Sequence, residues 1–90
     1  MKNKDLYESI LLLEKPEELE RFFVDIMTPA EIKAIKERWR VCQLLAHNQL
    51  SYREIHQITG ASLTTIGRVA RFLREEKNHG YKAILDKINK

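Results

Sequence analysis

The sequence has little glycine, proline or cysteine: its 90 residues include three glycines, two prolines and one cysteine. These numbers are too low for a strand-and-turn protein or a disordered linker. The single cysteine, Cys42, cannot form an internal disulfide, which fits a reducing cytosol. Because 43% of the residues are hydrophobic and 32% are charged, the composition is that of a small globular protein.

Long hydrophobic segments are lacking as well. The longest apolar run covers residues 10–13, whereas a helix that crosses a bilayer needs about 20 apolar residues. The first residues lead into no apolar stretch followed by a small-residue cleavage site, so a secretory signal is not expected. We therefore expect one helical domain over residues 1–90, with no membrane partner and a cytoplasmic location.

The residue patterns of enzymes and metal sites are also missing. The histidines at positions 47, 56 and 79 share no metal-ligand spacing, and Cys42 lies on an apolar stripe. There is no glycine-rich phosphate loop and no nucleophile elbow. The acidic residues 17 and 18 follow a proline and suit the first turn of a helix. We therefore predict neither an enzyme nor a bound metal or cofactor.

Apolar residues recur at helical spacing in six segments separated by short breaks, and no segment alternates as a strand would. Thr28-Pro29-Ala30-Glu31 has the pattern of a capping box and opens a long helix that reaches about residue 47. This helix is apolar on more than one face, and a 90-residue monomer cannot easily cover such a surface. The sequence therefore predicts an all-α fold whose core is completed by a second copy of the chain.

Residues 51–74 predict a helix-turn-helix. Ser51-Tyr52-Arg53-Glu54 forms a second capping box, Gly60 suits a left-handed turn, and Ser62 can cap the second helix. The spacing predicts buried stripes on both helices: Tyr52, Ile55 and Ile58 on the first, and Leu63, Ile66, Ala70 and Leu73 on the second.

Positive charge is concentrated in the second part of the chain. Residues 51–90 contain eight Lys/Arg and four Asp/Glu, a net charge of +4, whereas residues 1–50 have a net charge of −1. Residues 62–74 contain three arginines and no acid, which is typical of a surface that binds a polyanion. Double-stranded DNA is the predicted partner, read by the second helix in the major groove. The predicted contact residues are Arg53, Ser62, Thr64, Thr65, Arg68 and Arg71. The alternative is a helical module that binds a protein through the same surface.

These motifs also resemble the Trp repressor family, and in particular its YerC/YecD-like branch. The resemblance covers about residues 19–88 and is carried by motif order and by the gaps between motifs: Met27-Thr28-Pro29-Ala30-Glu31, Arg38-Trp39-Arg40-Val41, Leu50-Ser51-Tyr52-Arg53-Glu54-Ile55 and Gly60-Ala61-Ser62-Leu63-Thr64-Thr65-Ile66-Gly67-Arg68. It implies a six-helix, Trp-repressor-like fold and an intertwined homodimer. The dimerisation helices would lie at about residues 5–47 and 80–89. It further implies a transcriptional regulator that acts as a repressor.

The corepressor site of the family carries over only in part. The resemblance places the two arginines that flank the tryptophan ring at Arg38 and Arg68, with Thr28 and Thr65 at or near the same site. Val69 stands where the repressor has glycine, and its branched side chain adds volume at that point. Gly67 replaces a threonine on the DNA-facing side, so the operator need not be the same. We expect DNA binding that does not require tryptophan. A tryptophan-type responsive repressor, or one with another small-molecule effector, stays an alternative.

Overall fold

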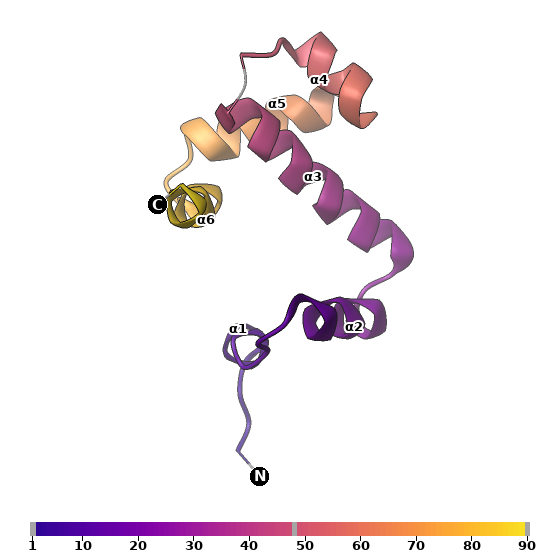
Figure 1. The fold of residues 1–90 in the computed structure, drawn as a ribbon, viewed down its shortest axis with the longest axis vertical. Helices are drawn as coiled ribbons and strands as arrows, with labels where there is room; N and C mark the ends of the chain where they lie inside the picture. The colour runs from indigo at the N-terminus through magenta and orange to yellow at the C-terminus, as the bar shows by residue number, and fades with distance from the viewer. Residues whose placement is uncertain (1, 48, 90) are drawn as a thin grey trace. The chain divides into compact units, whose positions relative to one another are not determined.

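The structure is a computed structural model that describes residues 2–47 and 49–89. Within these ranges it contains six helices and no strand, which confirms the predicted all-α fold. The helices are α1 Leu6–Ile10, α2 Pro16–Ile26, α3 Pro29–His47, α4 Tyr52–Thr59, α5 Leu63–Arg74 and α6 Gly80–Ile88 (Figure 1). No helix in the part of the chain that is described is long and apolar enough to cross a membrane.

Hydrogen-bonded caps fix where the helices begin. The Thr28 Oγ1 atom accepts the Glu31 backbone N–H at 3.2 Å, and Glu31 Oε1 accepts the Thr28 N–H at 2.8 Å. Ser51 and Glu54 repeat this exchange before α4, at 3.1 and 3.0 Å. Because each carboxylate accepts hydrogen bonds from its cap residue, the pKa of both Glu31 and Glu54 is lowered. Both predicted capping boxes are therefore confirmed.

The chain forms two compact units, Met1–Lys33 and Ala34–Lys90, and the boundary between them falls inside α3. The second unit contains the core. Its buried side chains come from α3, α4, α5, α6 and the turn after α4: Val41, Cys42, Leu45, Ile55, Ala61, Ile66, Val69, Ala70 and Leu85. Burial raises the pKa of the Cys42 thiol to about 11, so this cysteine is a neutral core residue. The expectation of one domain over residues 1–90 stays a prediction.

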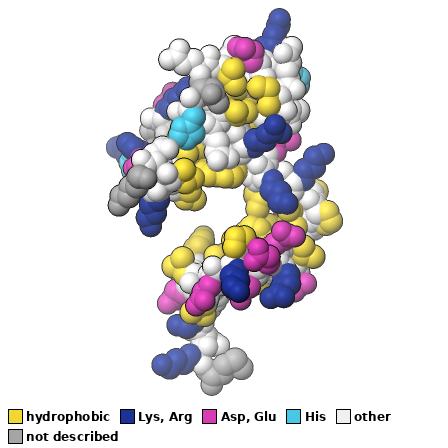
Figure 2. Space-filling model, viewed as in Figure 1, with side chains coloured by type: hydrophobic (Ala, Val, Ile, Leu, Met, Phe, Trp, Pro, Cys, Tyr) yellow, Lys and Arg dark blue, Asp and Glu magenta, His cyan; other side chains and the backbone are white. Residues whose placement is uncertain are grey.

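The first unit has no comparable core. Neither α1 nor α2 contains a buried residue. Large apolar side chains are instead exposed along this unit: Leu6, Tyr7, Leu11, Leu12, Val24 and Ile26. Figure 2 shows hydrophobic side chains on the face of this unit that is in view. Exposure of so many apolar side chains on one small unit is typical of a surface that another chain covers.

Three predictions of burial were wrong. Tyr52 and Ile58 are 41% and 45% exposed, so Ile55 is the buried member of the stripe predicted on α4. Leu63 is 57% exposed at the start of α5. The helical spacing is correct in each case, but in this unit no neighbouring helix covers these positions.

Candidate nucleic-acid interface

The candidate interface is built on α4, α5 and the turn that joins them, and the two helices pack against each other (Figure 1). Gly60 adopts the predicted left-handed conformation, with φ of 77°. The Thr59 hydroxyl donates to the Ile55 carbonyl at 2.7 Å and accepts the Ala61 N–H at 3.1 Å. His56 Nδ1 lies 2.6 Å from the Ala61 carbonyl oxygen, so this nitrogen must carry the hydrogen and donate it. These bonds fix the position of α5 relative to α4.

The start of α5 uses two of the predicted contact residues in its cap. Ser62 Oγ accepts the Thr65 N–H at 3.0 Å, and the Ser62 hydroxyl donates to Thr65 Oγ1 at 3.0 Å. Ser62 and Thr64 are exposed and Thr65 is half-buried. The first turn of α5 contains no acidic residue, so its positive helix end is not neutralised by an acidic side chain of that turn.

The exposed side of α5 carries Thr64, Arg68 and Arg71, which are spaced by four and three residues and so lie on one face. The opposite face is anchored in the core by Ile66 and Val69. Gly67 lies three residues after Thr64 and four before Arg71, and therefore on the same face of the helix. A Cβ atom built at Gly67 would meet nothing within 4 Å. The bare backbone at Gly67 therefore leaves room for another molecule to approach α5 closely.

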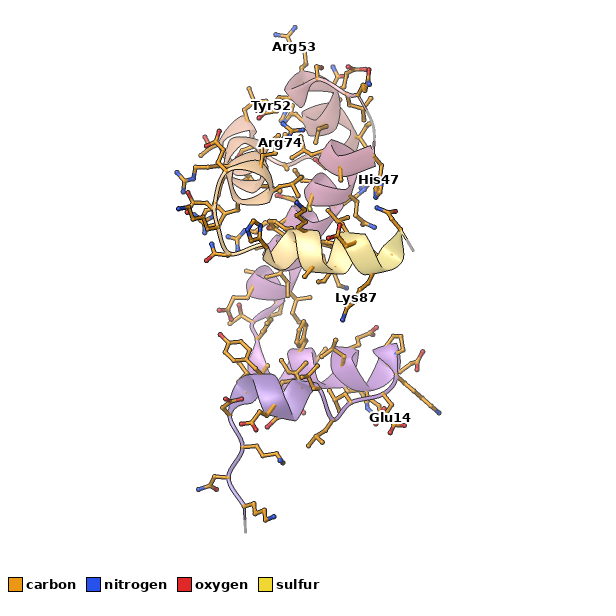
Figure 3. The ribbon with its side chains drawn as sticks, turned by 90° about the vertical axis from the view of Figure 1, so that its left-hand side faces the viewer. Glu14, His47, Tyr52, Arg53, Arg74 and Lys87 are labelled. Atoms are coloured by element: carbon orange, nitrogen blue, oxygen red, sulfur yellow. The ribbon has the colours of Figure 1, made fainter. Side chains whose placement is uncertain are left out.

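Two further arginines flank this surface and differ in their roles. Arg53 lies on the exposed side of α4, and its side chain projects away from the helices (Figure 3). The Arg74 guanidinium instead donates to the Leu45 carbonyl at 3.4 Å, which ties the end of α5 to the end of α3. Arg53 thus has the exposure that its predicted role requires, whereas Arg74 supports the packing of α5.

Two further residues of α5 were not predicted to contribute to this surface. Leu63, predicted to be buried, is exposed beside Ser62 and Thr64 and gives the front of α5 an apolar group. Phe72 has the guanidinium carbons of Arg68 and Arg71 over its ring, at 4.4 and 5.0 Å from the ring centroid. The spacing of four residues between Arg68 and Phe72 was a signal for this contact, because such residues are neighbours on a helix.

The predicted ligand residues are distributed over both units. Thr28 lies in the first unit as the cap of α3, whereas Arg38, Thr65 and Arg68 lie in the second. Val69 is buried, with 1% of its surface exposed, and packs in the core. The groups of three or more ligating side chains that a metal ion needs are absent from the residues described.

An aromatic pair from this chain lies near the two predicted ligand arginines. The Tyr81 ring of α6 stacks on Trp39 of α3, with ring centroids 6.4 Å apart and an interplanar angle of 24°. Burial raises the pKa of the Tyr81 phenol and the nearby Cys42 thiol adds to this effect, while the charges of Arg38 and Arg68 oppose it.

Comparison with known proteins agrees with this geometry. The model of the Trp repressor protein family matches residues 2–89. An uncharacterised Bacillus subtilis protein, YerC, is 40% identical over 83 residues, which cover 92% of this chain and 78% of YerC. A crystal structure of a candidate Trp repressor from Staphylococcus aureus has a TM-score of 0.85 and 39% identity, over 93% of this chain and 82% of that one. A TrpR-like protein from Eubacterium eligens has a TM-score of 0.85 and 34% identity, over 93% and 84% of the two chains.

The structural similarity extends over nearly the whole chain and is accompanied by sequence identities of 39% and 34%. The six-helix arrangement is thus that of a DNA-binding regulator fold, and the matching family is one of regulators and not of enzymes. The chain belongs to the Trp repressor family.

Proposed function

We propose that this protein is a sequence-specific DNA-binding transcriptional regulator, a cytoplasmic repressor that acts as a homodimer through the helix-turn-helix of α4 and α5. The observation that carries the proposal is the exposed, acid-free face of α5 with Thr64, Arg68 and Arg71, on a helix anchored to the core by its other side. Arginine can grip a guanine edge or a phosphate with two donors, and small hydroxyl groups allow close approach to the groove. The exposed Leu63 adds an apolar group of the kind that contacts a thymine methyl.

The test is an unbiased selection of bound duplexes from random DNA, followed by affinity measurements at several salt concentrations. Each phosphate that an arginine or lysine neutralises releases a counterion, so affinity must fall steeply as salt rises. With about six phosphate contacts per dimer, we expect affinity to fall roughly a thousandfold between about 50 and 200 mM salt. A module that binds a protein through an apolar surface would show little salt dependence and no enriched DNA sequence. That outcome would contradict the proposal.

The proposed homodimer is supported by the apolar residues exposed on α1 and α2, which the first unit leaves without a core. On α6, Ile84 and Ile88 are also exposed, at 51% and 53%. Covering such side chains is favourable by about 25 cal/mol for each Å² of apolar surface removed from water. A second copy of the chain, which carries the same apolar surface, is the proposed cover.

Sedimentation at micromolar concentration is expected to show a species of twice the 10.7 kDa chain mass. The reason is that the monomer alone leaves the apolar side chains of α1 and α2 in water. Replacement of Leu11 and Leu12, exposed by 84% and 65%, with glutamate should shift the equilibrium toward monomer. Gln57→Glu together with Asn78→Asp, at exposed neutral positions outside the proposed dimerisation helices, adds the same charge and provides the control. A wild-type protein that sediments as a well-folded monomer would exclude the intertwined dimer.

We further propose that DNA binding does not require tryptophan or another small-molecule corepressor. Two observations support this. Val69 is directed into the core and packs there, and the Tyr81 ring from α6 lies against Trp39 near the charges of Arg38 and Arg68. The branched side chain of Val69, next to Arg68 in the chain, thus adds volume where the repressor has glycine.

A further inference from the structure

Phe72 is an aromatic residue on α5 whose contacts are unlike those of the core. Among the residues described, the half-buried apolar side chains that pack on the core are Trp39, Leu44, Leu50, Leu73 and Tyr81. Phe72 is half-buried but does not belong to this set. Its ring instead lies beneath the guanidinium groups of Arg68 and Arg71. Phe72 therefore contacts side chains of the exposed side of α5.

The geometry at Phe72 brings two positive charges together. The guanidinium carbons lie 4.4 and 5.0 Å from the same ring centroid, so they can be no farther apart than the sum of these distances. Two cations at this range repel each other, and residues 62–74 contain no acid, the next ones in the chain being Glu75 and Glu76 at the end of α5. The negative face of an aromatic ring attracts each cation and so opposes the repulsion.

An arginine held over a ring keeps N–H groups for another partner. The attraction uses the face of the planar guanidinium, while its five N–H donors lie at the edges. Exposed arginines otherwise have many rotamers, and ordering them opposes binding. A ring that holds both side chains in one region lowers that cost before DNA arrives.

We infer that Phe72 is a positioning residue of the DNA-binding surface, whose ring holds the guanidinium groups of both Arg68 and Arg71 against it on the exposed side of α5. This inference rests on the proposed function, because the arginines act on DNA and Phe72 acts through them. Phe72 need not contact DNA itself.

The first measurement uses the free wild-type protein and needs no DNA. Protons above an aromatic ring are shielded, so the side-chain resonances of Arg68 and Arg71 should be shifted upfield in NMR spectra. Replacement of Phe72 with leucine should remove both shifts. Resonances of Arg68 and Arg71 at ordinary positions in the wild-type protein would overturn the inference, even if no variant can be purified.

The second measurement is the affinity for the selected duplex. Phe72→Leu should weaken binding about fivefold to tenfold, since two cation–π contacts at an exposed site are lost while both charges stay. Phe72→Tyr keeps the ring face and should bind within about twofold of wild type. Circular dichroism and sedimentation of both variants check that helix content and oligomeric state are unchanged.

A double-mutant cycle separates a positioning role from a structural one. In a chain that already carries Arg68→Ala and Arg71→Ala, the additional Phe72→Leu change should have no further effect on DNA affinity. The salt dependence of Phe72→Leu should match wild type, whereas each arginine variant that loses a phosphate contact should show a slope smaller by about one.

The possible failures can be told apart. Binding by Phe72→Leu as tight as wild type, or tighter, would overturn the inference, because the ring would then be neutral or would compete with DNA for the arginines. The inference would also be overturned if Phe72→Leu lowered DNA affinity by the same factor in the chain that already carries Arg68→Ala and Arg71→Ala. A wild-type protein that binds no duplex would instead contradict the proposed function, whatever the NMR shifts of the arginines.

Discussion

Replacement of Arg68 or Arg71 with alanine is expected to weaken specific DNA binding by about 1–3 kcal/mol each. Both side chains are exposed on the acid-free face of α5, and neither is required by the buried core. Their loss should therefore remove contacts to DNA without unfolding the unit. The measurement is fluorescence anisotropy with the selected duplex and with an unrelated duplex. If the replaced arginine reads a base, the variant should lose affinity mainly for the selected duplex. If it binds a phosphate, the variant should lose affinity for both duplexes.

Lys87→Ala is the matched control for these variants. Lys87 is exposed in the last turn of α6, so the substitution removes one positive charge outside the candidate interface (Figure 3). Its effect on affinity should be small and should fall on both duplexes alike. Equal losses for Arg68→Ala, Arg71→Ala and Lys87→Ala would mean that a diffuse positive field, and not a helix in the groove, attracts DNA.

The two arginine substitutions should not be additive. Because both guanidinium groups contact the Phe72 ring, loss of one removes its repulsion from the other and changes where the remaining side chain lies. Side chains that share a partner commonly show coupling energies of about 0.5–3 kcal/mol. The affinity of the double variant should therefore differ from the sum of the two single effects by the coupling energy between Arg68 and Arg71.

The parts of the fold that follow local rules were predictable from the sequence. A capping box needs a hydroxyl residue and a glutamate three positions later, and both Thr28-Glu31 and Ser51-Glu54 form the expected hydrogen bonds. The left-handed turn at Gly60 is equally local. In each case all the interacting atoms lie within a few residues, so residue type and spacing are sufficient.

Burial was harder to predict because it depends on neighbours that are distant in the sequence. Spacing correctly places Ile58 and Leu63 on the apolar side of their helices, yet each is exposed because the neighbouring helices of the unit cover other positions. Cys42 and Val41 are fully buried because α4, α5 and α6 contribute to the core beside them. Periodicity predicts on which face of a helix a side chain lies, but it does not predict which other element packs against that face.

The candidate site shows the same difference. The exposed Thr64, Arg68 and Arg71 were predictable from helical spacing and from the absence of acid in this segment. The aromatic neighbours were not, since an aromatic stripe most often indicates core. The stacking of Tyr81 on Trp39 joins residues that are far apart in the sequence and depends on how α6 packs. For the candidate ligand site, the family resemblance identified which positions to compare. The structure adds that the Val69 side chain, at the position where the repressor has glycine, is buried in the core.

Val69→Gly is expected to lower the free energy of unfolding by about 3 kcal/mol. Val69 is 1% exposed, so its removal leaves a cavity in the core in addition to the lost hydrophobic burial. Glycine in a helix interior costs about 1 kcal/mol more than alanine. Urea unfolding at fixed protein concentration measures the loss, and Val69→Ala separates the cavity from the backbone effect. A loss below about 1 kcal/mol for Val69→Gly would contradict the packing of Val69 in the core.

Tryptophan titration into the same three proteins then tests whether Val69 also excludes a ligand. Calorimetry of the wild-type protein should show no tight binding, and DNA affinity should be the same with and without tryptophan, because Val69 stands where the repressor has glycine and its branched side chain adds volume there. Micromolar binding with a tenfold gain in DNA affinity, a coupling of about 1.4 kcal/mol, would overturn the prediction. If tryptophan binds only to Val69→Gly and stabilises that variant against urea, the valine side chain alone blocks the site. If every variant fails to bind while Val69→Ala stays folded, the pocket differs in more than one residue, and titration of Tyr81→Ala tests whether the Tyr81 ring is one of them.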